Sequence, residues 1–341
     1  MNVLILGLGR IGLLHARHLV EDPRVERLLI IEPHAERRAH GLVALAPIAE
    51  AAVDLSTALA EDIQAAVVAT PSNLHFEHVG RLLDAGIPTF CEKPLALSAT
   101  EVLTLERRAN GVVPLMVGFQ RRFDDGYRRL AEACAEVRAR GFPPTLYRMA
   151  TADHAAPERA FLDGAGSIFH DMLIHDFDVL DLLCPSPVVA VTARASAAAL
   201  PPGSPGWGTA VVTCEVADGG LAVLTGTRAT GSGYEVSCQA TSGAGVFGIG
   251  TACDGTPLCH LDAPPITGPP DHDFIDRFGA AYRRELATFL GVAAGDRVAV
   301  PGTAEMLRAL TLAEAAVASA RGAGSVNGET ASHPQRIGLD G

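Results

Sequence analysis

The chain opens with Met1-Asn-Val-Leu-Ile-Leu-Gly-Leu-Gly-Arg-Ile-Gly12, and this stretch decides the fold. Val3–Leu6 is an unbroken apolar run with β-branched members, which indicates a short strand buried on both faces of a sheet. Three glycines follow in G-x-G-x-x-G spacing, and Ile11–Val20 has the pattern of an amphipathic helix. A strand, a glycine loop and a helix in this order predict a unit that binds the pyrophosphate of a dinucleotide at the helix N-terminus.

A second apolar run, Leu28–Ile31, leads into Glu32, which lies 32 − 12 = 20 residues after Gly12. At this distance an acidic residue is expected to bind the 2′-hydroxyl of the adenosine ribose. Because a carboxylate repels a 2′-phosphate, the sequence favours NAD over NADP, although Arg37 and Arg38 follow closely. These two arginines can also be read as solvated helix charges, and the glycine loop as a turn in an α/β domain that binds no nucleotide.

The composition is that of a globular protein with material for about two domains, since 48% of the 341 residues are hydrophobic and 19% are charged. The formal net charge of −12 argues against nucleic acid or an anionic membrane as a partner. No apolar stretch approaches the roughly 20 residues of a membrane span. The seven cysteines form no C-x-x-C pair, so we expect reduced thiols in a cytoplasmic protein.

The pattern of elements changes near residue 121. Before it, apolar runs alternate with helical segments, which predicts a doubly wound parallel sheet in an NAD-binding Rossmann domain, residues 1–121. After it, consecutive strands predict an α+β domain for the substrate, residues 122–325, with a mainly antiparallel sheet. Residues 326–341 lack periodicity and are expected to form a flexible tail. The expected strands of the second domain are Leu146–Ala152, Val188–Ala195, Thr209–Val216, Leu221–Thr227 and Tyr234–Ala240. Its expected helices are Arg122–Arg140, Ile168–Leu183, Phe274–Ala293 and Thr303–Ala320.

Three polar segments follow predicted strands of the first domain: Thr70–Asn73, Glu92–Pro94 and Gln120–Arg122. Ligands of parallel sheets bind at the C-terminal ends of the strands, so these segments are expected to surround one crevice. Lys93 can donate there to a substrate hydroxyl and stabilise the alkoxide that forms as a hydride leaves. From its position alone, Lys93 could equally be an ordinary surface lysine.

Asp171 and His175 lie four residues apart on a predicted helix, so they are expected to share one face, with Asp178 three residues further on. A carboxylate beside an imidazole fixes its tautomer, which suits a general base for the oxidation of an alcohol. A surface pair or a core histidine is the alternative. A metal site is not favoured, because His170 and His175 are five residues apart and point to different faces.

Together these segments resemble the Gfo/Idh/MocA family of nicotinamide-dependent oxidoreductases, over nearly the whole chain. The motifs that carry the resemblance are Gly7-Leu-Gly-Arg-Ile-Gly12, Ala69-Thr-Pro-Ser-Asn73 with His75, Glu92-Lys93-Pro94, Val117-Gly-Phe-Gln-Arg-Arg-Phe123, Asp171-x-x-x-His175 and Phe278–Phe289. Within the family, the sequence is most similar to inositol 2-dehydrogenases, through Ile174-His-Asp-Phe-Asp178 and Gly233-Tyr234 among others. The resemblance implies a Rossmann domain and a second domain built on a large open sheet, which often mediates oligomers.

By matching position, the resemblance implies that Lys93, Asp171 and His175 are the catalytic residues. The residues expected to bind substrate are Lys93, Arg122, Asp153, Asp171, His175 and Tyr234. The residues expected to bind the cofactor are Gly7, Gly9, Arg10, Ile11, Gly12, Glu32, Thr70, Pro71, Asn73, His75, Glu92, Lys93 and Gln120. On the residues alone, Asn73 and His75 could instead cap the following helix, and Asp153 and Tyr234 could be structural.

The implied activity is the NAD-dependent oxidation of a secondary alcohol on a cyclic polyol. We expect inositol, a related cyclitol or a sugar as substrate, no bound metal, and a homo-oligomer, either a dimer or a tetramer. A reductase that acts on a keto-sugar or a cyclitol ketone remains an alternative, because sequence does not show the physiological direction. A sensor that binds NAD without turnover is a second alternative from a different class.

Overall fold

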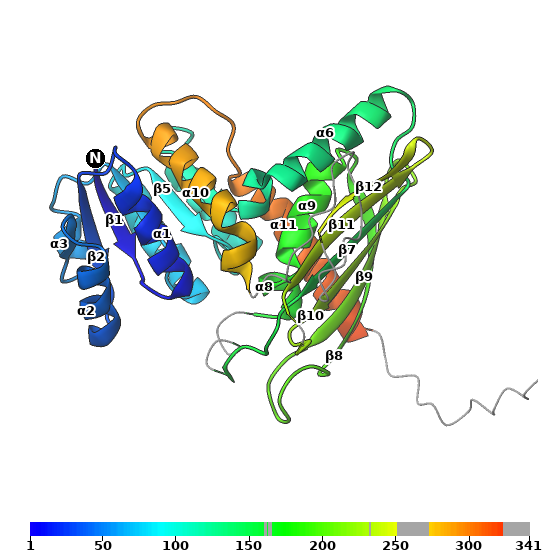
Figure 1. Ribbon diagram of the computed structural model, residues 1–341, viewed down its shortest axis with the longest axis horizontal. Coiled ribbons are helices and arrows are strands. Elements are labelled where there is room, and N and C mark those ends of the chain that lie inside the picture. Colours follow the sequence, from blue (N-terminus) through cyan, green and yellow to red (C-terminus); the bar gives the residue numbers. More distant parts are fainter. Residues whose placement is uncertain (160–161, 163–165, 232, 251–272, 323–341) are drawn as a thin grey trace, which may run out of the picture.

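Six parallel strands form the first sheet of the computed structural model, which describes residues 1–159, 162, 166–231, 233–250 and 273–322 (Figure 1). They lie in the order β3-β2-β1-β4-β5-β6, so the direction of winding reverses beside β1. The predicted doubly wound parallel sheet is thus confirmed. The strands are β1 (Asn2–Leu6), β2 (Arg27–Ile31), β3 (Ala49–Ala51), β4 (Ala65–Val68), β5 (Thr89–Glu92) and β6 (Leu115–Gly118). The helices that accompany them are α1 (Arg10–Glu21), α2 (Ala35–Ala44), α3 (Leu55–Ala58), α4 (His75–Asp84) and α5 (Ala99–Ala109).

The second sheet has the order β12-β11-β7-β10-β9-β8 and is antiparallel except between β7 and β10. In that parallel pair Ala152 lies beside Thr227, so both strands end at the same edge of the sheet. The strands are β7 (Leu146–Ala152), β8 (Val188–Ser196), β9 (Thr209–Val216), β10 (Leu221–Thr227), β11 (Glu235–Ser242) and β12 (Gly245–Ile249). The predicted mainly antiparallel sheet is confirmed, with one parallel pair that the sequence did not indicate.

The helices of the C-terminal half connect the two sheets. Helices α9 (Ile174–Leu183) and α11 (Thr303–Gly322) lie between the sheets, and α11 packs against both β8 and α5 (Figure 1). Helix α10 (Phe274–Ala293) returns to pack against α1. No helix within the described residues is long and apolar enough to cross a membrane. The expected tail, residues 326–341, lies outside the described residues.

Two helices expected from the sequence differ in the structure. The helix expected from Arg122 begins only at Asp125, because the Asp124 carboxylate caps α6 (Asp125–Ala139) by accepting from two backbone N–H groups. A short 3₁₀ helix, η2 (Gln120–Phe123), precedes it. The helix expected over residues 168–183 is divided into α8 (Ile168–Asp171) and α9, and the Leu173 amide bonds to the carbonyl oxygen five residues back. Such an extra residue in the turn rotates everything that follows it around the helix axis.

Alternation along the strands sorts the first sheet's side chains into two cores. Val3, Ile5 and their neighbours face α1 and α10, where they pack with Phe289 and Leu290. Leu4 and Leu6 face the other way, into a core that continues through α9 and α11 to the second sheet. One continuous core therefore fixes the position of the second sheet relative to the C-terminal edge of the first.

Glu285 is an exception in the apolar seam between α10 and the first sheet. It is fully buried, and neither carboxyl oxygen has a hydrogen-bond partner among the described residues. Burial, reinforced by the charge on Glu92, raises its pKa well above the ordinary value. Burial therefore favours the neutral acid of Glu285 over the carboxylate, since an isolated buried charge would be far more costly.

Glu285→Gln is expected to become more stabilising, relative to wild type, as the pH rises. The folded-state pKa is raised, so wild-type stability falls as the pH climbs from the ordinary carboxyl range towards that pKa, whereas glutamine cannot titrate. The difference in unfolding free energy should grow by about 1 kcal/mol for each pH unit above about pH 5. Thermal denaturation from acidic to alkaline pH measures it, with the exposed Glu314→Gln as control. Parallel curves for wild type and Glu285→Gln would contradict the assignment.

Candidate active site

The glycine loop after β1 has the shape that its sequence predicted. Gly7 has φ +91°, and a Cβ there would lie 2.6 Å from the Ala69 carbonyl oxygen. A Cβ on Gly12 would overlap the Gly7 carbonyl oxygen. At Gly9, in contrast, a Cβ would meet no protein atom within 4 Å, and α1 begins there without a side-chain cap. The open approach at Gly9 and the uncapped helix N-terminus fit the pyrophosphate of a dinucleotide.

Glu32 ends β2 beside this loop. One carboxylate oxygen accepts from the Leu8 N–H at 2.8 Å and the other from the His34 N–H at 2.8 Å. The carboxylate is thus held at the glycine loop, where the ribose of a dinucleotide is expected. Arg38 is already engaged, because its guanidinium donates to the carbonyl oxygen of Glu32.

His75 joins two of the loops at the strand ends. It is 1% exposed, and its ring nitrogens lie 2.7 Å from the carbonyl oxygens of Thr70 and Pro94. Burial lowers its pKa. His75 does not cap α4, whose N-terminus has no side-chain cap, because both of its ring nitrogens lie against the loop carbonyl groups. Its expected contact with the cofactor stays a prediction. Asn73 and Pro71 remain exposed on the same segment.

Glu92 is likewise held from behind, although it was expected to bind the cofactor. One of its oxygens lies 2.7 Å from Nε2 of His15, a fully buried residue of α1, and the other accepts from the Lys93 N–H at 3.2 Å. A Cβ on Gly118 would come within 3.1 Å of the same carboxylate, so the next strand leaves room for it. Glu92 therefore ties the dinucleotide-binding helix to the backbone of Lys93. Gln120 is also buried, at 4% exposure.

The Asp171 carboxylate lies at the centre of the candidate site, between two cations. Lys93 Nζ donates to the Asp171 backbone carbonyl at 2.7 Å and to Oδ1 at 3.1 Å. Arg228 donates to Oδ2 at 2.9 Å. Burial favours the neutral acid, but Lys93 and Arg228 outweigh it and lower the pKa of Asp171 below its ordinary value. Asp171 is therefore an anion shared between Lys93 and Arg228.

Asp171 bonds to Lys93 and Arg228, and among the described residues it makes no hydrogen bond to His175, so the expected Asp171–His175 pair is not formed in this structure. His175 Nδ1 is buried without a hydrogen-bond partner among the described residues, and the ring lies edge-on to Phe119 at 6.4 Å between centroids. Burial, and then the charges of Lys93 and Arg121, lower its pKa well below the ordinary value. His175 is thus a neutral imidazole close to Lys93.

Asp153 and Tyr234 complete the polar wall of the candidate site. Burial, and then the charge on Asp171, raise the pKa of Asp153 to about 6. Its carboxylate accepts no hydrogen bond from the described residues, although Lys93, Arg228 and Arg10 are close enough to act on it. Tyr234 is 8% exposed, burial raises the pKa of its hydroxyl, and the charge on Asp153 reaches it.

Arg122, which was expected to contact substrate, is bound by other residues. Its Nε donates to both oxygens of Asp178 at 2.8 and 3.0 Å, and Nη2 donates to Asp181 at 2.9 Å. Its neighbour Arg121 is fully buried and donates to Asp176 at 2.7 Å. The carboxylates of α9 thus pair with these two arginines. Within the described residues there is no cluster of three metal-binding side chains.

Two features of the sequence bear on this site but did not enter its prediction. Arg228 follows β10 directly, but only the parallel pairing with β7 brings it beside Asp153. Lys93 is the single lysine of the chain, whereas the other 26 of the 27 basic side chains are arginines. A lysine amine is a compact point charge, whereas the guanidinium of arginine is a planar fork, so Lys93 differs in kind from every other basic side chain.

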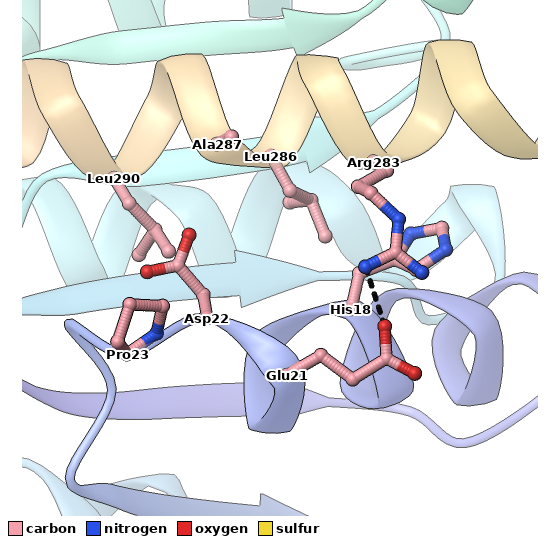
Figure 2. Close-up of a pocket in the computed structure, with 8 residues that line it drawn as sticks. All are labelled: His18, Glu21, Asp22, Pro23, Arg283, Leu286, Ala287 and Leu290. Carbon is pink, nitrogen blue, oxygen red and sulfur yellow. Dashed lines mark ion pairs between the residues drawn. The ribbon is translucent and has the colours of Figure 1, made fainter.

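A separate hollow of about 170 Å³ lies between the C-terminal end of α1 and α10 (Figure 2). The residues around it are His18, Glu21, Asp22, Pro23, Arg283, Leu286, Ala287 and Leu290. An ion pair between Glu21 and Arg283 spans it. It is at the opposite end of α1 from the glycine loop, and we assign it no part in the chemistry.

The glycine cradle and the group around Lys93 place the protein among the NAD-dependent oxidoreductases. The family profile described as oxidoreductase family, NAD-binding Rossmann fold, matches residues 1–119, and the Gfo/Idh/MocA C-terminal domain matches residues 142–247. The chain belongs to the Gfo/Idh/MocA family.

Named relatives agree with this assignment over most of the chain. A myo-inositol dehydrogenase, Hyg17, of Streptomyces leeuwenhoekii is 33% identical over 86% of this chain and 89% of its own. An inositol 2-dehydrogenase of Rhizobium meliloti strain 1021 is 31% identical over 92% of this chain and 95% of its own. The crystal structure of a myo-inositol dehydrogenase from Corynebacterium glutamicum superposes with a TM-score of 0.80, at 27% identity, over 94% and 97% of the two chains.

Two glycine substitutions should separate cofactor binding from folding. Gly9→Ala adds a methyl group in open space, at a backbone conformation that alanine tolerates, so stability should stay within about 1 kcal/mol while the Kd for NAD rises at least about tenfold. Gly12→Ala overlaps backbone and should lose roughly 1–3 kcal/mol of stability or more. Thermal denaturation and NAD titration measure both. Wild-type NAD affinity in Gly9→Ala would contradict the cradle.

Proposed function

We propose that the protein is an NAD-dependent dehydrogenase that oxidises a secondary alcohol of a cyclic polyol, with an inositol as the first substrate to test. The relatives named above supply the substrate class. The group around Lys93 supports the chemistry, because it places an amine, a carboxylate and a neutral imidazole at the cofactor edge of the sheet. Whether the alcohol is oxidised or its ketone is reduced in the cell depends on the metabolite ratios.

The single observation that carries this proposal is the hydrogen bonding of Lys93. An ammonium group has three N–H donors, and Asp171 takes two of them, one through its backbone and one through its carboxylate. The third N–H is left for a ligand. Lys93 can therefore donate to a substrate oxygen and stabilise the negative charge that develops on it.

In this mechanism His175 accepts the hydroxyl proton, since its depressed pKa keeps the imidazole neutral before the reaction. Lys93 holds the same oxygen, and Asp171 keeps the lysine in place. Bound NAD supplies the nicotinamide ring that accepts the hydride. We propose that Asp153 and Tyr234 bind further hydroxyls of the ring. Above about pH 6 Asp153 is an anion and accepts hydrogen bonds, which suits a polyol.

Cofactor contacts follow from the same edge of the sheet. We propose that Gly7, Gly9, Arg10, Ile11 and Gly12 approach the pyrophosphate, that Glu32 binds the ribose, and that Thr70, Pro71 and Asn73 line the nicotinamide side. Glu32 supports NAD over NADP, because a 2′-phosphate would face its carboxylate. We also retain residues 1–121 and 122–325 as the nucleotide and substrate domains, since β6, the last strand of the first sheet, ends at Gly118.

We further propose a cytoplasmic homo-oligomer. Val211, Leu221 and Val246, on three strands of the second sheet, are 44%, 50% and 52% exposed on the face that no helix of the described residues covers (Figure 1). A second copy of the chain would cover such apolar side chains. Cys91, Cys134, Cys184 and Cys214 are buried free thiols, as expected in a reducing compartment. Sedimentation of a monomer at micromolar concentration would contradict the oligomer.

Nicotinamide absorbance tests the proposed function directly. Purified protein is mixed with NAD or NADP and each member of a panel of inositol isomers, related cyclitols and cyclic sugars. We expect reduction of NAD by at least one inositol, and a lower kcat/KM with NADP by at least about tenfold. Reduction of NAD by a sugar, but by no inositol or other cyclitol, would change the proposed substrate class from cyclitols to sugars. Tight NAD binding without reduction by any compound would contradict the proposed enzyme and favour a sensor.

A further inference from the structure

Arg228 is held at the candidate site by the strand that precedes it. β10 ends at Thr227 and runs parallel to β7, so Arg228 and Asp153 leave neighbouring strands side by side. The Arg228 amide donates to the Gly208 carbonyl oxygen at 2.8 Å, which fixes its backbone. The side chain is 1% exposed. A guanidinium buried to this extent has little freedom, so whatever it binds is held in a definite place.

Arg228 and Lys93 divide the Asp171 carboxylate between them. Arg228 takes Oδ2 at 2.9 Å, and Lys93 takes Oδ1 at 3.1 Å together with the backbone carbonyl. With a cation on each oxygen, the plane of the carboxylate is fixed. Without Arg228 the carboxylate could turn about its own bond and follow the mobile lysine, because only one partner would remain.

We propose that Arg228 is a positioning residue for the reaction: by holding Oδ2 of Asp171, it aims the Lys93 amine so that its third N–H faces the substrate oxygen. This inference deepens the proposed function and rests on it for the identity of the substrate. Arg228 itself touches neither the reacting oxygen nor the cofactor in this arrangement. The alternative is a purely structural ion pair that joins β10 to α8.

The groups around Asp171 also give the proposal a pH signature. Lys93 faces it from the end of β5, Arg228 from the end of β10, and Asp153 from the end of β7. Burial raises the pKa of Asp171, and the two cations lower it further than burial raises it. Loss of the Arg228 charge should raise that pKa. As the pH is lowered, turnover that requires the Asp171 anion should then begin to fall at a higher pH than in wild type.

Arg228→Met keeps an unbranched apolar stem but removes the charged guanidinium. We expect kcat to fall about ten- to a hundredfold, with the Kd for NAD within about threefold, and the acid limb of the kcat profile to move up by about one pH unit. Arg228→Lys keeps the charge without the fork, so its acid limb should stay in place while kcat still falls severalfold.

Arg138→Met is the matched control. Arg138 donates to Asp218 at 2.8 Å, and Asp218 lies in the turn that precedes β10. The substitution therefore breaks an arginine–aspartate pair at the opposite end of the strand that Arg228 follows. It should lower stability without changing the acid limb. An equal loss of stability in Arg138→Met and Arg228→Met, with an altered pH profile only in the latter, separates positioning from structure.

A second readout does not require turnover. Because Lys93 is the single lysine of the chain, lysine labelled with ¹⁵N at Nζ gives one side-chain signal. Its hydrogen exchange should be slow in wild type and in Arg138→Met, and at least about tenfold faster in Arg228→Met, where the carboxylate is no longer held. If wild type oxidises no cyclitol, the proposed function fails, while this measurement still decides the role of Arg228.

The proposal is overturned if folded Arg228→Met shows wild-type Lys93 exchange. It is equally overturned if its acid limb and kcat match those of wild type. If Arg228→Met does not fold, Arg228→Lys decides: a reduced kcat with faster Lys93 exchange supports positioning, and wild-type values for both overturn it.

Discussion

The candidate site depends on one half-buried carboxylate shared by two cations. Asp171 receives Lys93 from the first sheet and Arg228 from the second, so the same side chain joins the two halves of the molecule. A carboxylate at this depth would be unstable alone, and a buried pair in which one partner is removed is strongly destabilised. The carboxylate is stabilised because each of its oxygens accepts a hydrogen bond from a cation. The same hydrogen bonds hold the lysine amine in one position.

Strand direction brings these groups to one place. Lys93 follows β5 in a wholly parallel sheet, whereas Asp153 and Arg228 follow the one parallel pair of an otherwise antiparallel sheet. Both sheets therefore present C-terminal strand ends towards the Asp171 carboxylate. The helices between them form a continuous core with both sheets, and the Glu92–His15 contact ties the lysine to the cofactor-binding helix. Rigid elements thus support the site from both sides.

Local patterns were sufficient to predict the dinucleotide unit, because the glycine loop, Glu32 and the strand ends are set by neighbours in sequence. They could not predict Arg228, since its position depends on β7 and β10 running in the same direction. The expected Asp171–His175 pair does not form because the Asp171 carboxylate is taken by Lys93 and Arg228, both more than 50 residues away. The ion pairs of Arg122 could not be predicted, because its counter-ions, Asp178 and Asp181, lie more than 50 residues away. Long-range pairing, rather than propensity, decided each of these cases.

The turnover of Lys93→Ala tests the central claim most directly, because that claim assigns the remaining N–H of Lys93 to the substrate oxygen. The variant should bind NAD with a Kd within about threefold of wild type, because its side chain is not part of the glycine cradle. Its kcat with the substrate that wild type oxidises should be lower by about a hundred- to a thousandfold. A kcat within a few-fold of wild type, with NAD still bound, would contradict the account.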